Sequence, residues 1–123
     1  AKEFMGKLVD GEPCVAFDDL WMSPISLEYA VGALVKIASS NLSGIFHLSG
    51  SEEMTYATFA DRLAAHIGVD PALVQPRRST DAGVEVLFRP EHPALGMKRT
   101  SDLLNIQPEP TTHLMDKLFS RKR

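Results

Sequence analysis

The 123-residue sequence has one cysteine, Cys14, and no apolar run that approaches the roughly 18 residues needed to span a membrane. A single cysteine excludes an internal disulfide framework, and no charged-then-apolar leader indicates secretion. We therefore expect a protein of the reducing cytoplasm without a membrane segment. Because Cys14 begins the apolar run Cys-Val-Ala-Phe, we expect it to be a buried packing residue.

A net positive charge is also lacking, since 16 Asp and Glu residues outnumber 13 Lys and Arg residues and the net charge is −3. No basic field is available to attract nucleic acid or an anionic membrane, so neither is expected as a partner. The basic end at 121–123 is typical of a solvated tail. A content of 44% hydrophobic and 24% charged residues is ordinary for a globular chain, and the length suits one domain with a buried core.

Several chemical signatures are missing. The eight glycines form no cluster of the kind that lets a backbone approach a dinucleotide pyrophosphate, so we expect no cofactor binding by this chain alone. The four histidines and the cysteine lack the spacing of a metal site. His47 lies in an apolar run that we interpret as a strand, which favours a structural role. The sequence Ser-Gly-Ser at 49–51 lacks the flanks of a nucleophile elbow and is interpreted as a turn.

Two helices have clear sequence signals. The first is predicted over 26–39, starting at Ser26, with one apolar face expected to be buried, made of Leu27, Ala30, Val31, Leu34, Ile37 and Ala38. The second is capped by Thr55 and stops at Gly68. Its apolar positions keep the helical period throughout, so it is the most securely predicted element.

The remaining elements are shorter. We expect a helix at the start of the chain, strands over 14–17, 45–48 and 84–88, a single turn after Asp70, a short extended piece from Leu73, a polar loop over 76–83, and helices over 100–104 and 114–119. Helices with a few isolated short strands predict an α/β lobe. A complete dinucleotide-binding fold requires more consecutive strand-helix-strand steps.

One run of motifs resembles a known family. It comprises Gly-Ile-Phe-His-Leu-Ser-Gly at 44–50, a helix, Phe-Arg-Pro at 88–90, Leu95, Lys98 and Leu-Leu-Asn-Ile at 103–106. The order is similar to the C-terminal portion of the extended short-chain dehydrogenase/reductase family, in particular the dTDP-4-dehydrorhamnose reductases, and the resemblance covers about 4–119. It implies that residues 1–123 are a single C-terminal substrate-binding domain or fragment of a Rossmann-type reductase, without the N-terminal dinucleotide-binding domain.

The resemblance implies a parent enzyme in which NADP or NAD passes a hydride to the 4-keto carbon of a nucleotide-linked deoxysugar. In this family a tyrosine donates the proton and a lysine follows it by four residues. Tyr29 and Tyr56 are followed at that spacing by Ala33 and Ala60, so the catalytic pair is missing. We therefore expect the chain alone to be inactive and to hold no cofactor or metal, and to act by positioning the nucleotide-sugar substrate.

Two stretches are candidates for substrate binding. Arg89 precedes Pro90 in an element that faces the sugar nucleotide in the resembled family, and both a substrate contact and a structural clamp remain open for it. Trp21, Met22 and Ser23 lie in a stretch that aligns with the family loop D-Q-x-x-x-P-T, although the glutamine and threonine are replaced here. Trp21 is expected either to stack on a base or to pack under the missing domain.

Two alternatives stay open. The same motifs resemble the regulatory beta subunit of methionine adenosyltransferase, a reductase-like protein without a catalytic role, and a stand-alone interaction domain is a third possibility. The chain opens within an apparent helix, which favours a fragment over the third possibility. A lobe separated from its partner domain is expected to expose an apolar patch and to associate into homodimers. The sequence preceding Ala1 would discriminate among the three.

Overall fold

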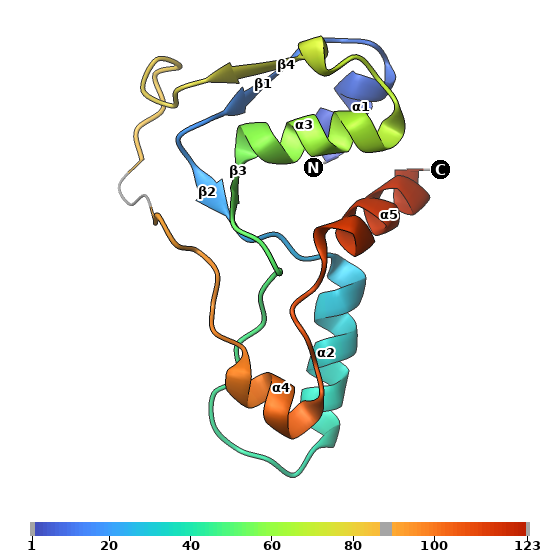
Figure 1. Ribbon diagram of the computed structural model, residues 1–123, viewed down its shortest axis with the longest axis vertical. Helices are drawn as coiled ribbons and strands as arrows, with labels where there is room; N and C mark the ends of the chain where they lie inside the picture. The colour runs from blue at the N-terminus through green and yellow to red at the C-terminus, as the bar shows by residue number, and fades with distance from the viewer. Residues whose placement is uncertain (1, 87–89, 123) are drawn as a thin grey trace.

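The structure is a computed structural model that describes residues 2–86 and 90–122, with side chains described within 6–86 and 90–118. Figure 1 shows two halves: α1, α3, β1 and β4 lie in the upper half, α2 and α4 lie in the lower half, and α5 lies beside α3. The elements in order are α1 (Lys2–Val9), β1 (Cys14–Phe17), β2 (Trp21–Met22), α2 (Leu27–Ser39), β3 (Met54–Thr55), α3 (Tyr56–Ile67), the 3-10 turn η1 (Pro71–Leu73), β4 (Val74–Arg77), α4 (Lys98–Leu104) and α5 (Thr111–Lys122). The predicted mixed α/β fold is confirmed.

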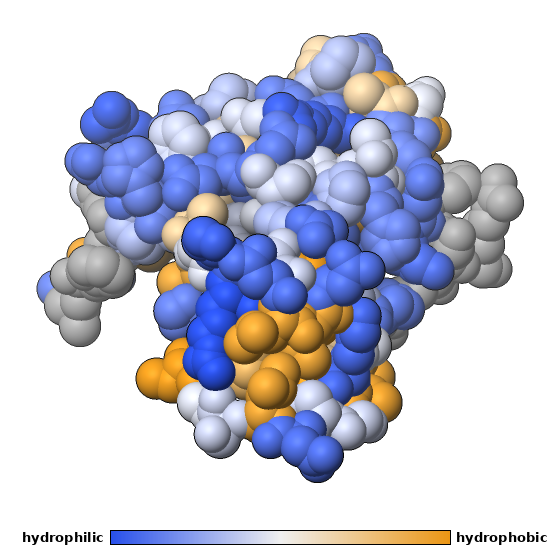
Figure 2. All heavy atoms as spheres, turned by 60° about the horizontal axis from the view of Figure 1, so that its bottom comes forward, coloured by the Kyte–Doolittle hydropathy of each residue, from blue (hydrophilic) through white to orange (hydrophobic). Residues whose placement is uncertain are grey.

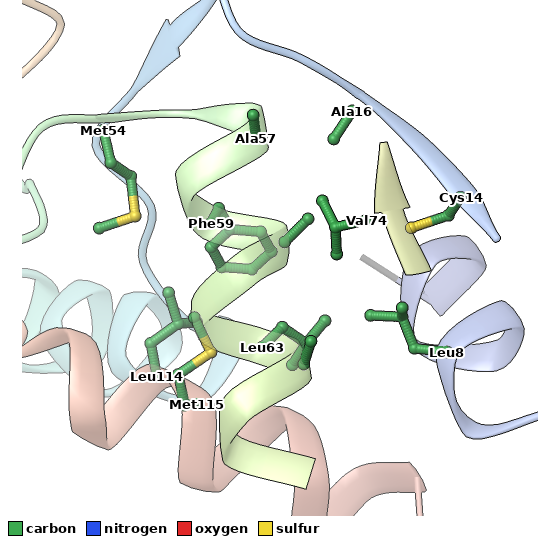
Figure 3. Close-up of a cluster of buried hydrophobic side chains, with 12 residues drawn as sticks. Leu8, Cys14, Ala16, Met54, Ala57, Phe59, Leu63, Val74, Leu114 and Met115 are labelled. Atoms are coloured by element: carbon green, nitrogen blue, oxygen red, sulfur yellow. The ribbon is translucent and has the colours of Figure 1, made fainter. Parts of the chain in front are cut away.

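Helix α3 is the centre of the main core. The Thr55 side chain accepts a hydrogen bond from the Thr58 amide at 3.1 Å, and Gly68 ends the helix in the left-handed conformation with φ +79°. Both predicted boundaries are therefore confirmed. Figure 3 shows Leu114 and Met115 of α5 directed toward α3 on one side, and Cys14, Val74 and Leu8 on the other. The buried residues of α3 are Ala57, Phe59, Ala60, Leu63 and Ala64.

Two small sheets flank this core. Strand β1 pairs in parallel with β4, with Cys14 opposite Val74, and Cys14 is only 2% exposed, as predicted. Strand β4 continues through Pro76 and Arg77, the first two residues of the segment 76–83 that was predicted to be a loop. Pro76 is compatible with it because a two-stranded sheet has only edge strands. Strand β2 pairs antiparallel with β3. These two-residue strands were not predicted, because they are too short to show a hydrophobic period.

The strand predicted over 45–48 is wrong. The segment alternates as a strand does, with Phe46 and Leu48 packed inward and Ile45 77% exposed, but it pairs with no other strand in the described part of the chain. A strand needs a neighbour for its backbone groups, and sequence composition does not supply one. Residues 84–86 likewise form no strand, and 87–89 of that prediction lie outside the described residues.

Helix α2 forms where predicted, but the prediction of its buried face is wrong. Ala33 is its one buried residue, and it joins a small second cluster with Met97, Leu104 and Ile106. The exposed large apolar side chains of α2 form a stripe at positions i, i+4, i+7 and i+8: Leu27, Val31, Leu34 and Val35. The two C-terminal helices also form, each starting two or three residues before its predicted start.

Candidate functional site

The stretch between β1 and α2 contains three of the candidate site residues, and hydrogen bonds fix it at several points. The Asp19 carboxylate accepts bonds from the Ser79 amide at 3.0 Å and the Ser79 hydroxyl at 2.8 Å. The Leu20 carbonyl accepts from the Tyr56 amide at 3.1 Å, at the start of α3. This stretch, residues 18–26, is called the β2 loop below. It is therefore tied to the segment that follows β4 and to the start of α3 before it reaches α2.

The three candidates of the β2 loop point in different directions. Trp21 is 43% exposed. Met22 packs against the main core and lines a cavity. The Ser23 hydroxyl lies 3.1 Å from the Ser49 hydroxyl and donates to the Gly50 carbonyl at 3.2 Å, so it serves the internal structure. Arg89, the fourth candidate, lies outside the described residues.

The close approach of two backbone segments explains why glycine stands at position 50. A Cβ at Gly50 would clash with the Pro24 carbonyl oxygen, well inside van der Waals contact. Only a residue without a side chain allows the β2 loop to lie this close to the segment that follows the 45–48 run. Gly50, the last residue of the motif at 44–50, is thus required by local packing.

A cavity of about 370 Å³ lies between the end of the β2 loop, α3 and α5. Its size suits part of a small organic ligand. Its wall is mainly apolar, and four polar side chains contribute to it: Ser26, Glu28, Tyr56 and Lys117. The apolar lining residues are Met22, Pro24, Ile25, Leu27, Phe59, Leu114 and Leu118. Sequence reasoning placed Met22 near a site but missed the α5 wall, because the amphipathic pattern of α5 indicated a helix and not what it faces.

A buried carboxylate adjoins this cavity. Glu109 is 1% exposed, and its two oxygens accept from the Ser26 amide at 2.5 Å, from the Ser26 hydroxyl at 2.6 Å and from His113 Nδ1 at 2.5 Å. Its backbone also bridges the segment at Gly50, since its amide bonds to the Ser49 carbonyl and its carbonyl accepts from the Ser51 amide. Sequence reasoning missed Glu109, because a glutamate between two prolines is typical of a solvated loop.

The N-termini of α2 and α3 bond to groups of this chain. At α2 the Ser26 amide donates to the Glu109 carboxylate, and at α3 the Tyr56 amide donates to the Leu20 carbonyl and the Thr58 amide to the Thr55 hydroxyl. A pyrophosphate needs such amides to be open and flanked by glycines. Across 2–86 and 90–122 no group of three or more metal-ligating side chains comes together, and no helix is long and apolar enough to cross a membrane.

Two titratable groups with shifted pKa values, Tyr29 and Glu52, lie outside the cavity lining and are held in structural bonds. Burial, together with the nearby Glu109 carboxylate, raises the pKa of Tyr29, whose hydroxyl donates to the Gln107 carbonyl at 2.6 Å. Hydrogen bonds from Thr111 and Arg62 lower the pKa of Glu52. Neither shift prepares a proton donor for a reaction near neutral pH. The arrangement is suited to binding and orienting a ligand.

The lower half of the molecule has a second notable surface. The stripe Leu27, Val31, Leu34 and Val35 on α2 is at least half exposed at every position, and Ile45 adds to the exposed apolar surface of this half. Figure 2, in which the lower half is turned forward, shows a hydrophobic patch bordered by hydrophilic residues. Contiguous apolar surface of this kind marks an interaction site in soluble proteins.

Comparison with known proteins gives fold matches only. No protein-family model and no curated protein matches the sequence. Among solved structures, a dTDP-4-dehydrorhamnose reductase from Bacillus anthracis in complex with NADP matches 98% of this chain at 17% identity with a TM-score of 0.79. A dTDP-glucose 4,6-dehydratase from the same organism, in complex with NAD, matches 93% at 8% identity and 0.71. Another from Streptomyces venezuelae, with NAD bound, matches 87% at 15% identity and 0.66.

The matches confirm the fold expected from the resemblance. The chain spans 42% of the reductase and 37% and 32% of the two dehydratases, so it corresponds to less than half of each solved chain. These longer proteins are nucleotide-sugar enzymes that bind NADP or NAD. The structural likeness thus extends over nearly the whole of this chain and over a minor part of theirs.

Proposed function

We propose that this chain is the C-terminal, substrate-binding lobe of an NAD(P)-dependent reductase that acts on a nucleotide-linked 4-keto-deoxysugar. The observation that carries the proposal is the fold match over 98% of the chain to a dTDP-4-dehydrorhamnose reductase, at a TM-score of 0.79. The motifs at 44–50 and 88–90, quoted above, independently favour the same assignment. The lobe positions the substrate, and the hydride and proton transfers take place on residues and a cofactor outside this chain.

The cavity and the β2 loop are the proposed substrate side of the lobe. Met22 forms part of the apolar wall, and Lys117 adds a positive charge that suits a diphosphate. Trp21 is exposed and carries a flat aromatic face on which a nucleotide base can stack. Ser23 supports the loop from within, through Ser49 and Gly50. Arg89 is the proposed bidentate contact to the diphosphate or the sugar.

The stripe on α2 is the proposed contact for the dinucleotide-binding domain. The solved proteins that contain a lobe of this fold have more than half of their length outside it. An apolar helix face that this chain leaves exposed fits against such a domain, and covering it would remove the patch from water. We therefore propose that NADP or NAD binds to that domain and that this chain holds neither.

Binding measurements on the isolated chain test the proposal that the cofactor binds to the other domain and not to this lobe. Isothermal titration calorimetry is expected to detect no micromolar binding of NADPH or NADH, because the eight glycines of the sequence form no cluster that lets a backbone approach a pyrophosphate. Micromolar affinity for either would overturn the proposal. The sequence encoded before Ala1 provides a second test. A glycine-rich loop together with the catalytic tyrosine and lysine supports the enzyme. Replacement of the tyrosine or the lysine by another residue supports a regulatory reductase-like subunit.

Variants of Arg89 in the parent enzyme test the substrate contact. Loss of a charge-assisted hydrogen bond predicts a decrease in kcat/KM for Arg89→Ala equivalent to roughly 1.5 to 3 kcal/mol. Arg89→Lys should recover only part, because an ammonium cannot reproduce the planar fork. Arg78→Ala, at an exposed arginine, is the matched control. If Arg89 is instead a structural clamp, Arg89→Ala and Arg89→Lys will both lower the melting temperature and leave the kinetics of the folded enzyme unchanged.

A further inference from the structure

Glu109 joins three segments that are distant in sequence. Its carboxylate bonds to Ser26, where the β2 loop enters α2, and to His113, in the first turns of α5. Its backbone bridges Ser49 and Ser51 in the segment after the 45–48 run. These are three of the structural units that surround or support the cavity. One side chain therefore connects the cavity wall formed by the β2 loop with the wall formed by α5.

The burial of this carboxylate needs an explanation. A carboxylate removed from water is costly unless donors surround it, and Glu109 meets that need with a helix N-terminal amide, a hydroxyl and an imidazole. A hydroxyl cap such as Thr55 is enough to start α3 without any buried charge. The charge at α2 is thus more than helix capping requires, and its distinctive feature is the connection between α2 and α5.

The β2 loop is fixed at three levels, and Glu109 supplies the last. Asp19 holds its start through Ser79, Ser23 holds its middle through Ser49, and Ser26 holds its end through Glu109. Ser49 is itself bonded to the backbone of Glu109. The middle and the end of the loop therefore depend on the same residue.

We infer that Glu109 is a positioning residue that sets the separation of the two cavity walls and so the placement of Met22 beside the substrate. The geometric part of this inference is independent of the ligand, whereas its link to substrate rests on the proposed function. Lys117 and Leu114 lie on the α5 side of the cavity, and Ser26 and Met22 on the other. A shift of α5 relative to the β2 loop changes the distance between these groups.

Three variants of the full chain test the inference. Glu109→Ala removes every side-chain bond. Glu109→Gln removes the charge, but its carbonyl oxygen still accepts from the Ser26 amide and its NH₂ can donate to the ring nitrogen of His113 in the other tautomer. Glu52→Ala is the matched control, because Glu52 also holds the start of α5, through the Thr111 hydroxyl at 2.7 Å, without touching the β2 loop.

Hydrogen-deuterium exchange resolves the effect by segment. Glu109→Ala is expected to speed exchange of the amides in 22–29 by about tenfold or more, as when a buried polar group loses its partner, while α3 amides keep their protection. Glu109→Gln should give a smaller increase, and Glu52→Ala none in that segment. Unchanged exchange at 22–29 in Glu109→Ala overturns the inference. A uniform increase through α3 also overturns it, because the role would then be general stability.

A binding measurement separates this inference from the proposed function. In the parent protein, Glu109→Gln is expected to weaken binding of dTDP-glucose, used as the probe, several-fold more than Glu52→Ala does. If amide exchange at 22–29 becomes faster and affinity for the probe stays unchanged, the positioning role of Glu109 stands and the cavity is not the substrate site. If exchange at 22–29 does not change, the positioning role fails whatever the affinity shows.

Discussion

Helices α2 and α3 are nearly equal in length, at 13 and 12 residues, and each begins at a hydroxyl cap, yet they are packed very differently. Helix α3 buries five residues between β1, β4, α1 and α5, whereas α2 buries Ala33 alone. Both sequences have apolar residues at helical spacing. The spacing therefore predicts a helix, and the presence of a partner surface decides whether its apolar face is buried.

The difference divides the molecule into a self-sufficient half and a dependent half. The half around α3 has a core that closes within the chain (Figure 3). The half around α2 has a small cluster on one side and the open stripe on the other. We expect the first half to carry the stability of the isolated chain and the second to gain stability when a partner covers it.

The largest expected effect is a core truncation. Leu63 is fully buried in α3, so Leu63→Ala should lower the free energy of unfolding by about 2 to 5 kcal/mol. Leu34 is 57% exposed on α2, so Leu34→Ala should change it by less than about 0.5 kcal/mol. Urea denaturation of the two variants measures both. Equal losses would show that the stripe on α2 is covered in solution.

The helix caps provide the second comparison. Ser26 both accepts from the Tyr29 amide at 3.1 Å and donates to the buried Glu109 carboxylate, whereas Thr55 supports only its own helix and Thr58. Ser26→Ala should therefore cost about 2 kcal/mol and Thr55→Ala about 1 kcal/mol. Thermal or chemical unfolding gives the ranking. A larger loss for Thr55→Ala would contradict the importance of the Glu109 connection.

The sequence predicts local features well and long-range ones poorly. Helix α3 was predicted with both ends, because its cap, its period and Gly68 are neighbours in sequence and agree with its burial. The 45–48 strand failed because pairing depends on a neighbour that composition does not reveal. The Glu109 connection joins residues 83 positions apart, and no local pattern predicts it. Met22 was selected through a family resemblance, and the α5 wall that faces it was not.

Rising alkaline pH should lower the stability of the two halves one after the other, first at Cys14 and then at Tyr29. Burial raises the pKa of Cys14 from its usual 9.0, so the folded state favours the protonated thiol. The resulting stability is complete below pH 9.0 and decreases as pH rises above it, by at most about 1.4 kcal/mol per pH unit for one group. Tyr29 behaves likewise above 10.0. Denaturation between pH 8 and 10 should show a decline that Cys14→Ala reduces; an unchanged decline would exclude the thiol.

The smallest expected effect on stability comes from a charge on the stripe. Leu34→Lys should change the free energy of unfolding by less than about 0.5 kcal/mol, because the side chain is already largely in water. It should nevertheless weaken any self-association through the apolar patch. Light scattering across a concentration series measures this, with Ala38→Leu, which extends the stripe at an exposed position eleven residues after Leu27, as the opposite control. A wild-type chain that stays monomeric throughout would remove the expected homodimer.

The parallel pairing of β1 with β4 has a consequence for how the chain folds. Cys14 pairs with Val74, and the chain between them contains both α2 and α3. Closing so long a loop has an entropic cost that arises before any core contact compensates it. Helix α3 contacts both strands and forms from local interactions. We therefore expect α3 to provide the surface on which the two strands meet late, so that the rate of refolding depends on this closure.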